Sequence, residues 1–161
     1  MRRAVIVVAA WGVCAGGMAQ SACEVDKEPT LALINFMRNG GANCGTRGVY
    51  APAMSLVWNV NLQAMAQVHA EGLAAAGELR HTNEHGHTIG QRALAVGYRF
   101  ARVGENLAQG QKSVDVVLRA WSGSETHCVN MYGPLFTETA LACALGADGR
   151  PVWVMVVARP R

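Results

Sequence analysis

The clearest periodic segment of the sequence lies between residues 59 and 77. Asn59 or Asn61 is suited to cap a helix there, and Gly77 is suited to end it. The positions that share one face at helical spacing are apolar except for one histidine: Leu62, Met65, Ala66, His69 and Leu73. We therefore predict an amphipathic helix, and we interpret His69 as a histidine at the edge of the core rather than as a ligand.

Similar patterns predict three further helices. One runs from Glu28 to Arg38, and Gly40 and Gly41 follow its end. A short helix is expected from Ile89 to Val96, and another begins at Ser113, a residue type that favours the N-cap. The last of these helices has a buried stripe of Val114, Val117, Leu118 and Trp121. The segments "GGANCGTRGVYAPAM" and "RHTNEHGHT" are rich in turn formers and are predicted to be loops.

The C-terminal part of the sequence has the pattern of a β-hairpin. The segments "TALACALG" and "PVWVMVVA" flank the turn pair Asp148–Gly149. The second of them is apolar at all alternating positions, which is typical of a strand covered on both faces. Helices together with a doubly covered sheet predict a three-layer α-β-α sandwich. Upstream, "YRFAR" shows strand-like alternation, and "GEN" at 104–106 is interpreted as a turn.

The N-terminus has the layout of a secretory signal peptide. Arg2 and Arg3 precede the apolar run "AVIVVAAWGVCAGGMA", and small residues follow. The run is short for a membrane span and is interrupted by glycines. We expect residues 1–21 to be the signal and residues 22–161 to form one domain, with no stable membrane span after cleavage. The expected location is secreted or periplasmic.

Charge and cysteine content refine this picture. Without residues 1–21 the chain has 12 basic and 11 acidic residues, a formal net charge of +1, so there is no electrostatic argument for a nucleic-acid partner. Cys14 leaves with the signal, and an even set remains, which predicts two disulfides in an exported protein. The remaining cysteines are Cys23, Cys44, Cys128 and Cys143.

One local motif resembles a zinc peptidase signature. The residues from His81 to His85 read H-x-x-E-H, which would need both histidines on one helical face. Asn83 and Gly86 disfavour a helix there, and the segment follows a helix stop. We therefore predict a polar loop without this zinc site, although His85 and His87 can bind metal adventitiously.

A second set of chemical groups is dispersed along the chain. His81, Glu105, His127 and Glu138 are each predicted to lie where a regular element begins or ends. In a layered fold such ends can converge on one cleft. Two imidazoles and two carboxylates can hold a divalent metal ion or exchange protons. Spacing alone does not group these four residues.

The order of several motifs resembles bacterial CAP domains, the superfamily of cysteine-rich secretory, antigen-five and pathogenesis-related proteins. The matching parts are "GENLA", the Trp–Ser–His–Asn run in "WSGSETHCVN", and "FTE", in a stretch from about Glu28 to the C-terminus. The resemblance implies an α+β fold, an α-β-α sandwich whose central sheet is mainly antiparallel. It also implies a cleft lined by His81, Glu105, His127 and Glu138. In some relatives this cleft binds zinc, and others bind sterols or fatty acids in separate grooves.

Individual residues depart from the family pattern or admit two roles. Where relatives usually read Ser-Pro-Gly-His, this chain has Ser124-Glu125-Thr126-His127, and Glu125 either adds a carboxylate beside the cleft or faces water. Glu105 is expected to lock its own turn, to pair with a histidine, or both. Asn106 is expected to brace the backbone. Ser122 and Ser124 lack the pattern of a serine nucleophile.

The disulfide pairing stays open between two alternatives. We favour Cys44–Cys128 with Cys23–Cys143, because Cys44 lies in a long loop and a bond at Cys128 would fix the neighbouring His127. Cys23–Cys44 with Cys128–Cys143 closes shorter loops and is retained as the alternative.

Three functions follow as hypotheses. The first is an exported binding module for a lipid, a sterol, a cell-wall fragment or a divalent metal ion. The second is a zinc-dependent hydrolase that uses His81, His127 and a carboxylate. The third is an interaction or toxin-like protein, with a protein partner and an idle cleft. No enzymatic activity is implied by the resemblance itself, and zinc is the only candidate cofactor.

Overall fold

Four strands form the central sheet of the protein. A computed structural model describes residues 23–161, and the strand order in the sheet is β3-β5-β6-β4. The strands are β3 (Val57–Trp58), β4 (Phe100–Gln109), β5 (Glu138–Leu145) and β6 (Pro151–Pro160). β6 pairs antiparallel with both β4 and β5, whereas β3 is parallel to β5. The sheet is therefore mainly antiparallel, as predicted.

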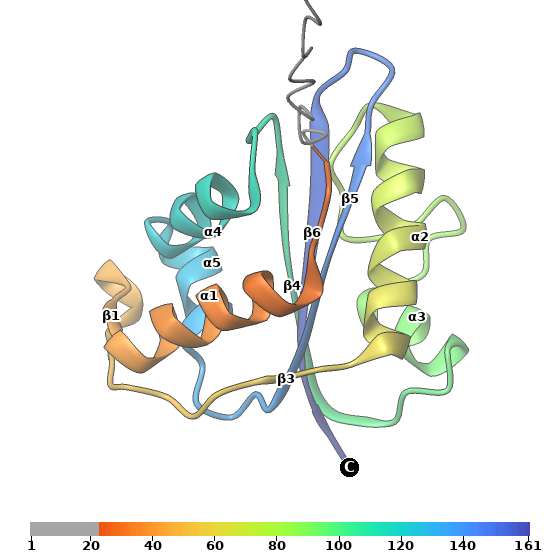
Figure 1. The fold of residues 1–161 in the computed structure, drawn as a ribbon. Coiled ribbons are helices and arrows are strands. Elements are labelled where there is room, and N and C mark those ends of the chain that lie inside the picture. The colour runs from red at the N-terminus through yellow and green to blue at the C-terminus, as the bar shows by residue number, and fades with distance from the viewer. Residues whose placement is uncertain (1–22) are drawn as a thin grey trace, which may run out of the picture.

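Helices cover both faces of this sheet. The helices are α1 (Lys27–Gly40), α2 (Val60–Ala76), α3 (Ile89–Ala95), α4 (Val114–Ser122) and α5 (Glu125–Tyr132). Figure 1 shows α1, α4 and α5 on one side of the sheet and α2 with α3 on the other. Residues 151–158 of β6 are all buried between the two helical layers. The three-layer α-β-α sandwich and the doubly covered last strand are thus confirmed.

The helix ends follow the signals in the sequence. The Asn59 side chain accepts hydrogen bonds from the backbone N–H groups of Asn61 and Leu62 and so caps α2. Gly77 ends α2 in the left-handed conformation, which glycine adopts without a Cβ penalty. Ser113 caps α4 as expected. The sequence patterns therefore located these helices within about two residues.

The interpretation of "GEN" as a turn is wrong. Gly104, Glu105 and Asn106 lie inside β4 and pair with β6 without interruption. A Cβ atom on Gly104 would lie 2.8 Å from Asn130 Oδ1 of α5. The glycine is therefore needed for the close approach of α5 to the strand and not for a change of chain direction.

Two other segments differ from the prediction. His127 lies near the start of α5, a short helix that the sequence patterns did not predict, and only Gly123 and Ser124 separate it from α4. The long segment after α1 contains a two-stranded ribbon, β1 (Ala42–Asn43) with β2 (Val49–Tyr50), around a 3-10 turn, η1 (Gly45–Arg47). Elements this short carry too few positions for a periodic pattern.

The segment that carries H-x-x-E-H is a loop, as predicted. It lies between α2 and α3, and Asn83 Oδ1 accepts hydrogen bonds from the backbone N–H groups of His85 and His87. The motif therefore has no helix on which to place its two histidines.

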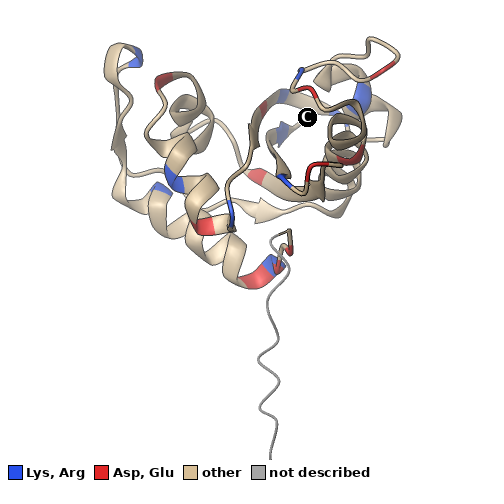
Figure 2. Cartoon of the chain, turned by 90° about the horizontal axis from the view of Figure 1, so that it is seen from above, with Lys and Arg blue, Asp and Glu red and all other residues tan. Residues whose placement is uncertain are grey.

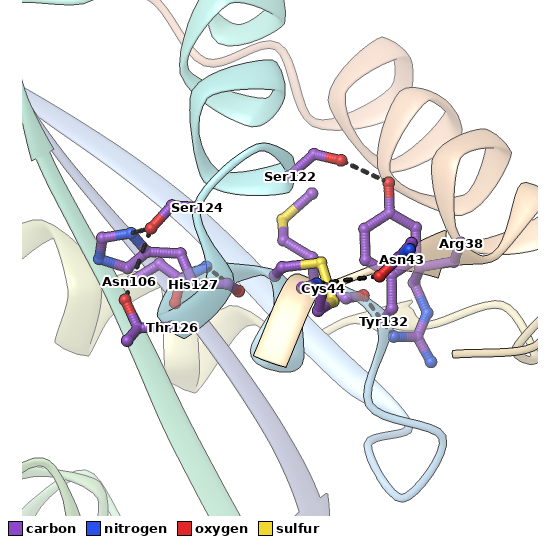
Figure 3. Close-up of a disulfide and its surroundings, with 12 residues drawn as sticks. Arg38, Asn43, Cys44, Asn106, Ser122, Ser124, Thr126, His127 and Tyr132 are labelled. Carbon is purple, nitrogen blue, oxygen red and sulfur yellow. Dashed lines mark hydrogen bonds between the residues drawn. A yellow bond between two sulfur atoms is a disulfide. The ribbon is translucent and has the colours of Figure 1, made fainter. Parts of the chain in front are cut away.

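The structure contains the disulfides Cys44–Cys128 and Cys23–Cys143, the favoured one of the two pairings. The first links the segment before η1 to α5, and Figure 3 shows it beside His127. The second links the N-terminal segment to β5.

The expected signal peptide lies outside the described residues. Within residues 23–161, no helix has the length and apolar character needed to cross a membrane.

Candidate functional site

Glu105 is the central residue of the candidate site. It lies in the middle of β4 opposite Val156 of β6, and its side chain is only 2% exposed. Its contacts come from α2, α3 and the loop between them, so the side chain points to the face of the sheet that these helices cover. A carboxylate at such a position requires compensation by charge or hydrogen bonds.

Two side chains satisfy the two carboxylate oxygens. Arg92 Nη2 lies 2.7 Å from Glu105 Oε2, and His81 Nδ1 lies 2.9 Å from Glu105 Oε1. Arg92 Nη2 also donates to the His81 carbonyl oxygen at 3.2 Å. The arginine therefore fixes the loop that carries His81 as well as the carboxylate that orients its ring.

His81 presents its ring to solvent. Its side chain is 65% exposed, and Nδ1 is held by Glu105. Nε2 has no hydrogen-bond partner within residues 23–161. The hydrogen bond to the Glu105 carboxylate raises the pKa of His81 above its ordinary value, against the opposing effect of partial burial.

His69 belongs to the same group, which the sequence analysis missed. Its Nε2 lies 3.1 Å from the Arg80 carbonyl oxygen and 3.7 Å from Glu105 Oε1. Burial lowers the pKa of His69 despite the nearby carboxylate and so favours the neutral form of the ring. Its helical spacing correctly indicated burial, but only the fold shows that Glu105 is its neighbour.

His127 supplies the second imidazole. Its Nδ1 lies 2.9 Å from Ser124 Oγ at the start of α5, as Figure 3 shows. Burial lowers the pKa of His127, and the charge on His81 lowers it further. The two histidines are 46 positions apart in the sequence; His127 lies in α5 and His81 in the loop after α2.

A network of amides links β4 to α5. Asn106 Nδ2 donates to the His127 carbonyl oxygen at 3.0 Å, which confirms the backbone-bracing role expected of Asn106. Asn130 Nδ2 donates to Asn106 Oδ1 at 2.8 Å and to the Glu105 carbonyl oxygen at 3.1 Å. The helix that carries His127 is thus fixed to the strand that carries Glu105.

Glu138 does not join this group. Its Oε2 accepts hydrogen bonds from Tyr98 Oη at 2.7 Å and from Asn59 Nδ2 at 2.9 Å. In the sheet, β6 separates β5 from β4, which puts the two carboxylate positions at least about 10 Å apart. The structure therefore brings His81, Arg92 and His69 to Glu105, joins His127 to the neighbouring Asn106 through its carbonyl oxygen, and places Glu138 elsewhere. Burial and the Glu138 carboxylate raise the pKa of Tyr98.

Glu125 points away from the two histidines. Its Oε2 accepts a hydrogen bond from Thr46 Oγ1 of η1, and this contact lowers the pKa of Glu125. A Cβ on Gly45 would collide with the same carboxylate. Of the two alternatives for Glu125, the structure therefore supports an outer position against the 3-10 turn.

Arg92 is the functional candidate that the sequence analysis did not identify. Its side chain is 7% exposed on the inner side of α3. The available signal was a charged residue among the apolar positions of "IGQRALA". A buried arginine usually has a charged partner, but the sequence does not say which carboxylate it meets.

Metal ligation at this site would depend on few protein groups. Within residues 23–161, no three side chains of histidine, cysteine, aspartate or glutamate gather in a geometry that could hold an ion. What the site offers is a pair of imidazoles, each oriented through Nδ1. Such an arrangement can bind a metal ion weakly or donate and accept hydrogen bonds.

Comparison with known proteins identifies the class. The family model "CAP: Cysteine-rich secretory protein family" matches residues 31–157. The chain therefore belongs to the cysteine-rich secretory protein (CAP) family, which confirms the resemblance seen in the sequence.

Individual relatives support the same fold. Protein YkwD of Bacillus subtilis is 44% identical over 47 residues, which are 29% of this chain and 18% of that protein. An extracellular protein of Bacillus anthracis with an SCP domain superposes with a TM-score of 0.67 at 20% identity, over 81% of this chain and 39% of that one. An outer surface protein of Borrelia burgdorferi gives a TM-score of 0.66 at 18% identity, over 85% and 97% of the two chains. This chain thus spans less than half of the first two proteins.

Proposed function

We propose that the protein is an exported binding module whose cleft binds a ligand through His81 and His127, with a divalent metal ion, preferably zinc, held between them. The observation that carries the proposal is the hydrogen bond of His81 Nδ1 to the Glu105 carboxylate at 2.9 Å. Metal-binding histidines commonly donate a hydrogen bond from the N–H of their second ring nitrogen to a carboxylate, which fixes the tautomer and makes the free nitrogen more basic.

His127 supports the proposal by the same logic. Its Nδ1 is engaged by Ser124 Oγ, so its Nε2 is the nitrogen that remains for a ligand. Two protein nitrogens leave further coordination positions for water or for a donor atom of the ligand. A bound ion would thus supply an electrophilic anchor for an oxygen atom, and we propose a lipid or a cell-wall-derived molecule as its source.

Binding is favoured over hydrolysis by the state of Glu105. A general base must accept a proton from a water molecule or a substrate within hydrogen-bond reach. Both oxygens of Glu105 are already engaged, one by Arg92 and one by His81, and the side chain is 2% exposed. The carboxylate is therefore placed to orient His81 and not to activate water.

Export is part of the proposal. Two disulfides are typical of proteins that fold outside the reducing cytoplasm. The similar proteins include one described as extracellular and one described as an outer surface protein. The signal-like pattern of residues 1–21 adds to this support, and we propose a secreted or periplasmic location.

Calorimetric titration with zinc tests the proposal. We expect His81→Ala and His127→Ala each to lower zinc affinity at least tenfold, and Glu105→Gln to lower it by about 10- to 100-fold. His85→Ala removes an exposed histidine outside the cleft; because His85 and His87 can bind metal adventitiously, this variant measures that contribution and should leave the affinity of the cleft unchanged. Unchanged affinity in both cleft variants would overturn the metal proposal.

A further inference from the structure

Four arginines gather at one end of the central sheet, where β4 begins and β6 ends. Arg99 precedes β4 and Arg102 lies in it, Arg159 lies near the end of β6 and Arg161 follows it, and all four residues are exposed. Arg102 is directly opposite Arg159 in the sheet, and the backbone N–H of Arg161 donates to the Arg99 carbonyl oxygen at 3.2 Å. Two cross-strand pairs of like charge therefore follow one another at this end of the sheet, next to the C mark in Figure 1.

A β-bulge brings the four side chains to one face of the sheet. The register shifts between Phe100 and Arg102, so β4 uses one residue more than β6 between the two arginine pairs. Side chains alternate between the two faces of a regular strand. Without the bulge, Arg99 and Arg102, which are three positions apart, would lie on opposite faces. With the bulge, both lie on the face that carries Arg159 and Arg161.

No carboxylate pairs with this cluster within residues 23–161. The arginines that form ion pairs there are Arg92, Arg119 and Arg150. Glu138 is the acidic residue of the neighbouring strand, but it is opposite Ala158 and therefore faces the other side of the sheet from Arg159. Like charges directly opposite one another destabilise a sheet. An external anion bound to the cluster would thus relieve an unfavourable interaction.

An exposed leucine lies at the same end of the sheet. The backbone N–H of Thr137 donates to the Ala158 carbonyl oxygen at 2.9 Å, so the turn between α5 and β5 lies beside the end of β6. This turn carries Leu135, which is 43% exposed. A membrane surface offers phosphate groups to arginine and an apolar interface to leucine, whereas a soluble polyanion makes no use of the leucine. The combination therefore favours a membrane surface.

We propose that this end of the sheet attaches the exported protein to an anionic membrane surface. The arginines 99, 102, 159 and 161 bind the phosphate groups of lipid headgroups, and Leu135 enters the interface. Guanidinium groups bind phosphate oxygens in a bidentate manner, with planar geometry. Each arginine close to an anionic surface contributes about a fivefold gain in binding. This attachment involves neither the proposed zinc cleft nor a metal ion.

Sedimentation with lipid vesicles tests the proposal in the presence of a chelator. The sample is residues 22–161, the exported form expected after cleavage, because an apolar signal segment would itself bind lipid. We expect vesicles of phosphatidylcholine with about 30% phosphatidylglycerol to bind the protein about tenfold more tightly than pure phosphatidylcholine. This binding should be lost at about 0.5 M salt, which screens exposed charges. Equal binding to both kinds of vesicle, or no binding to the anionic ones, would overturn the proposal.

Matched variants locate the binding surface. Arg102→Gln/Arg159→Gln removes one cross-strand pair and should weaken vesicle binding about 25-fold. Arg119→Gln/Arg150→Gln removes the same charge from side chains that are 68% and 61% exposed elsewhere, and it should retain most of the binding. Equal losses in the two variants would overturn the placement. Melting temperatures report folding, and Arg102→Gln/Arg159→Gln should be at least as stable as the wild type, because it removes a like-charge pair.

Soluble polyphosphate distinguishes a membrane from a phosphate polymer in solution. We expect it to bind more weakly per phosphate than the anionic vesicles do. Leu135→Ser should weaken vesicle binding severalfold and leave polyphosphate binding unchanged. Equal binding of polyphosphate and vesicles, with no effect of Leu135→Ser, would assign the cluster to a soluble polyanion and overturn the membrane proposal. Zinc titration of Arg102→Gln/Arg159→Gln should match the wild type, so this inference and the cleft proposal can fail independently.

Discussion

Arg92 Nη2 lies 2.7 Å from Glu105 Oε2, and the two side chains are 7% and 2% exposed. The pair joins α3, in one helical layer, to β4, in the central sheet. It also holds His81 through both the carboxylate and the His81 carbonyl oxygen. This ion pair, rather than a four-residue ligand set, organises the side chains around His81.

Breaking this pair from one side should destabilise the fold. In Arg92→Met the Glu105 carboxylate remains buried with only His81 and His69 nearby. We expect the free energy of unfolding to fall by about 3–5 kcal/mol, as measured by urea denaturation at pH 7. The double variant Arg92→Met/Glu105→Met leaves no buried charge and should recover much of the loss. A double variant less stable than Arg92→Met would contradict this account.

The histidines His69, His81 and His127 should titrate in a defined order. The pKa of His81 is raised by its hydrogen bond to Glu105, and the pKa values of His69 and His127 are lowered by burial. Histidine ring signals followed by nuclear magnetic resonance should place the His81 midpoint above the other two. Glu105→Gln should lower the His81 midpoint, because the neutral amide no longer favours the imidazolium.

These shifts fix the sign of the pH dependence of stability. The raised pKa of His81 stabilises the fold fully below its ordinary value of 6.5, and this contribution is lost as the pH rises through the folded value. The lowered pKa values of His69 and His127 contribute above 6.5, and their contribution is lost as the pH falls. A His81 midpoint at or below that of His127 would contradict the assignment.

The Cys44–Cys128 disulfide should affect the cleft as well as stability. Cys128 adjoins His127 in α5, so removing the bond frees the start of that helix. We expect Cys44→Ala/Cys128→Ala to lose about 2–5 kcal/mol of stability and to bind zinc several times more weakly. Cys23→Ala/Cys143→Ala is the control, because this bond lies far from both histidines in the chain. It should lose similar stability and keep its zinc affinity; a parallel loss of affinity would show a general effect of unfolding.

Gly104 should not tolerate a side chain. An alanine Cβ there would approach Asn130 Oδ1 to 2.8 Å and push away the amide that braces Glu105 and Asn106. Overpacking of this kind costs about 1–3 kcal/mol, measurable by denaturation. Gly40→Ala, where nothing lies within 4 Å of the added Cβ, should be neutral or stabilising. Adding Asn130→Ala to Gly104→Ala should relieve the steric part of the cost, and an unchanged loss would place its origin elsewhere.

The basic and acidic residues are distributed over the whole described part of the chain. Apart from the four arginines where β4 begins and β6 ends, Figure 2 shows the two signs interspersed over the chain rather than gathered on one face. Outside that cluster, the near-neutral charge counted from the sequence is therefore also spread in space.

The sequence by itself determined α1 to α4, the C-terminal hairpin and the layered architecture, but not α5. Residues such as Asn59, Gly77 and Ser113 act on their immediate neighbours, so their effect can be predicted locally. The two-sided apolar pattern of β6 likewise requires cover on both faces, whatever the connections are.

Only the tertiary structure decided which charged groups meet. Glu105 lies 13 positions from Arg92 and 24 from His81, and Glu138, which shares its residue type, meets Tyr98 and Asn59 instead. Strand order and register determine these partners, because β6 separates β5 from β4. Local patterns do not contain that information. The sequence therefore supplied candidate residues, and the order and register of the strands decide which of these residues meet.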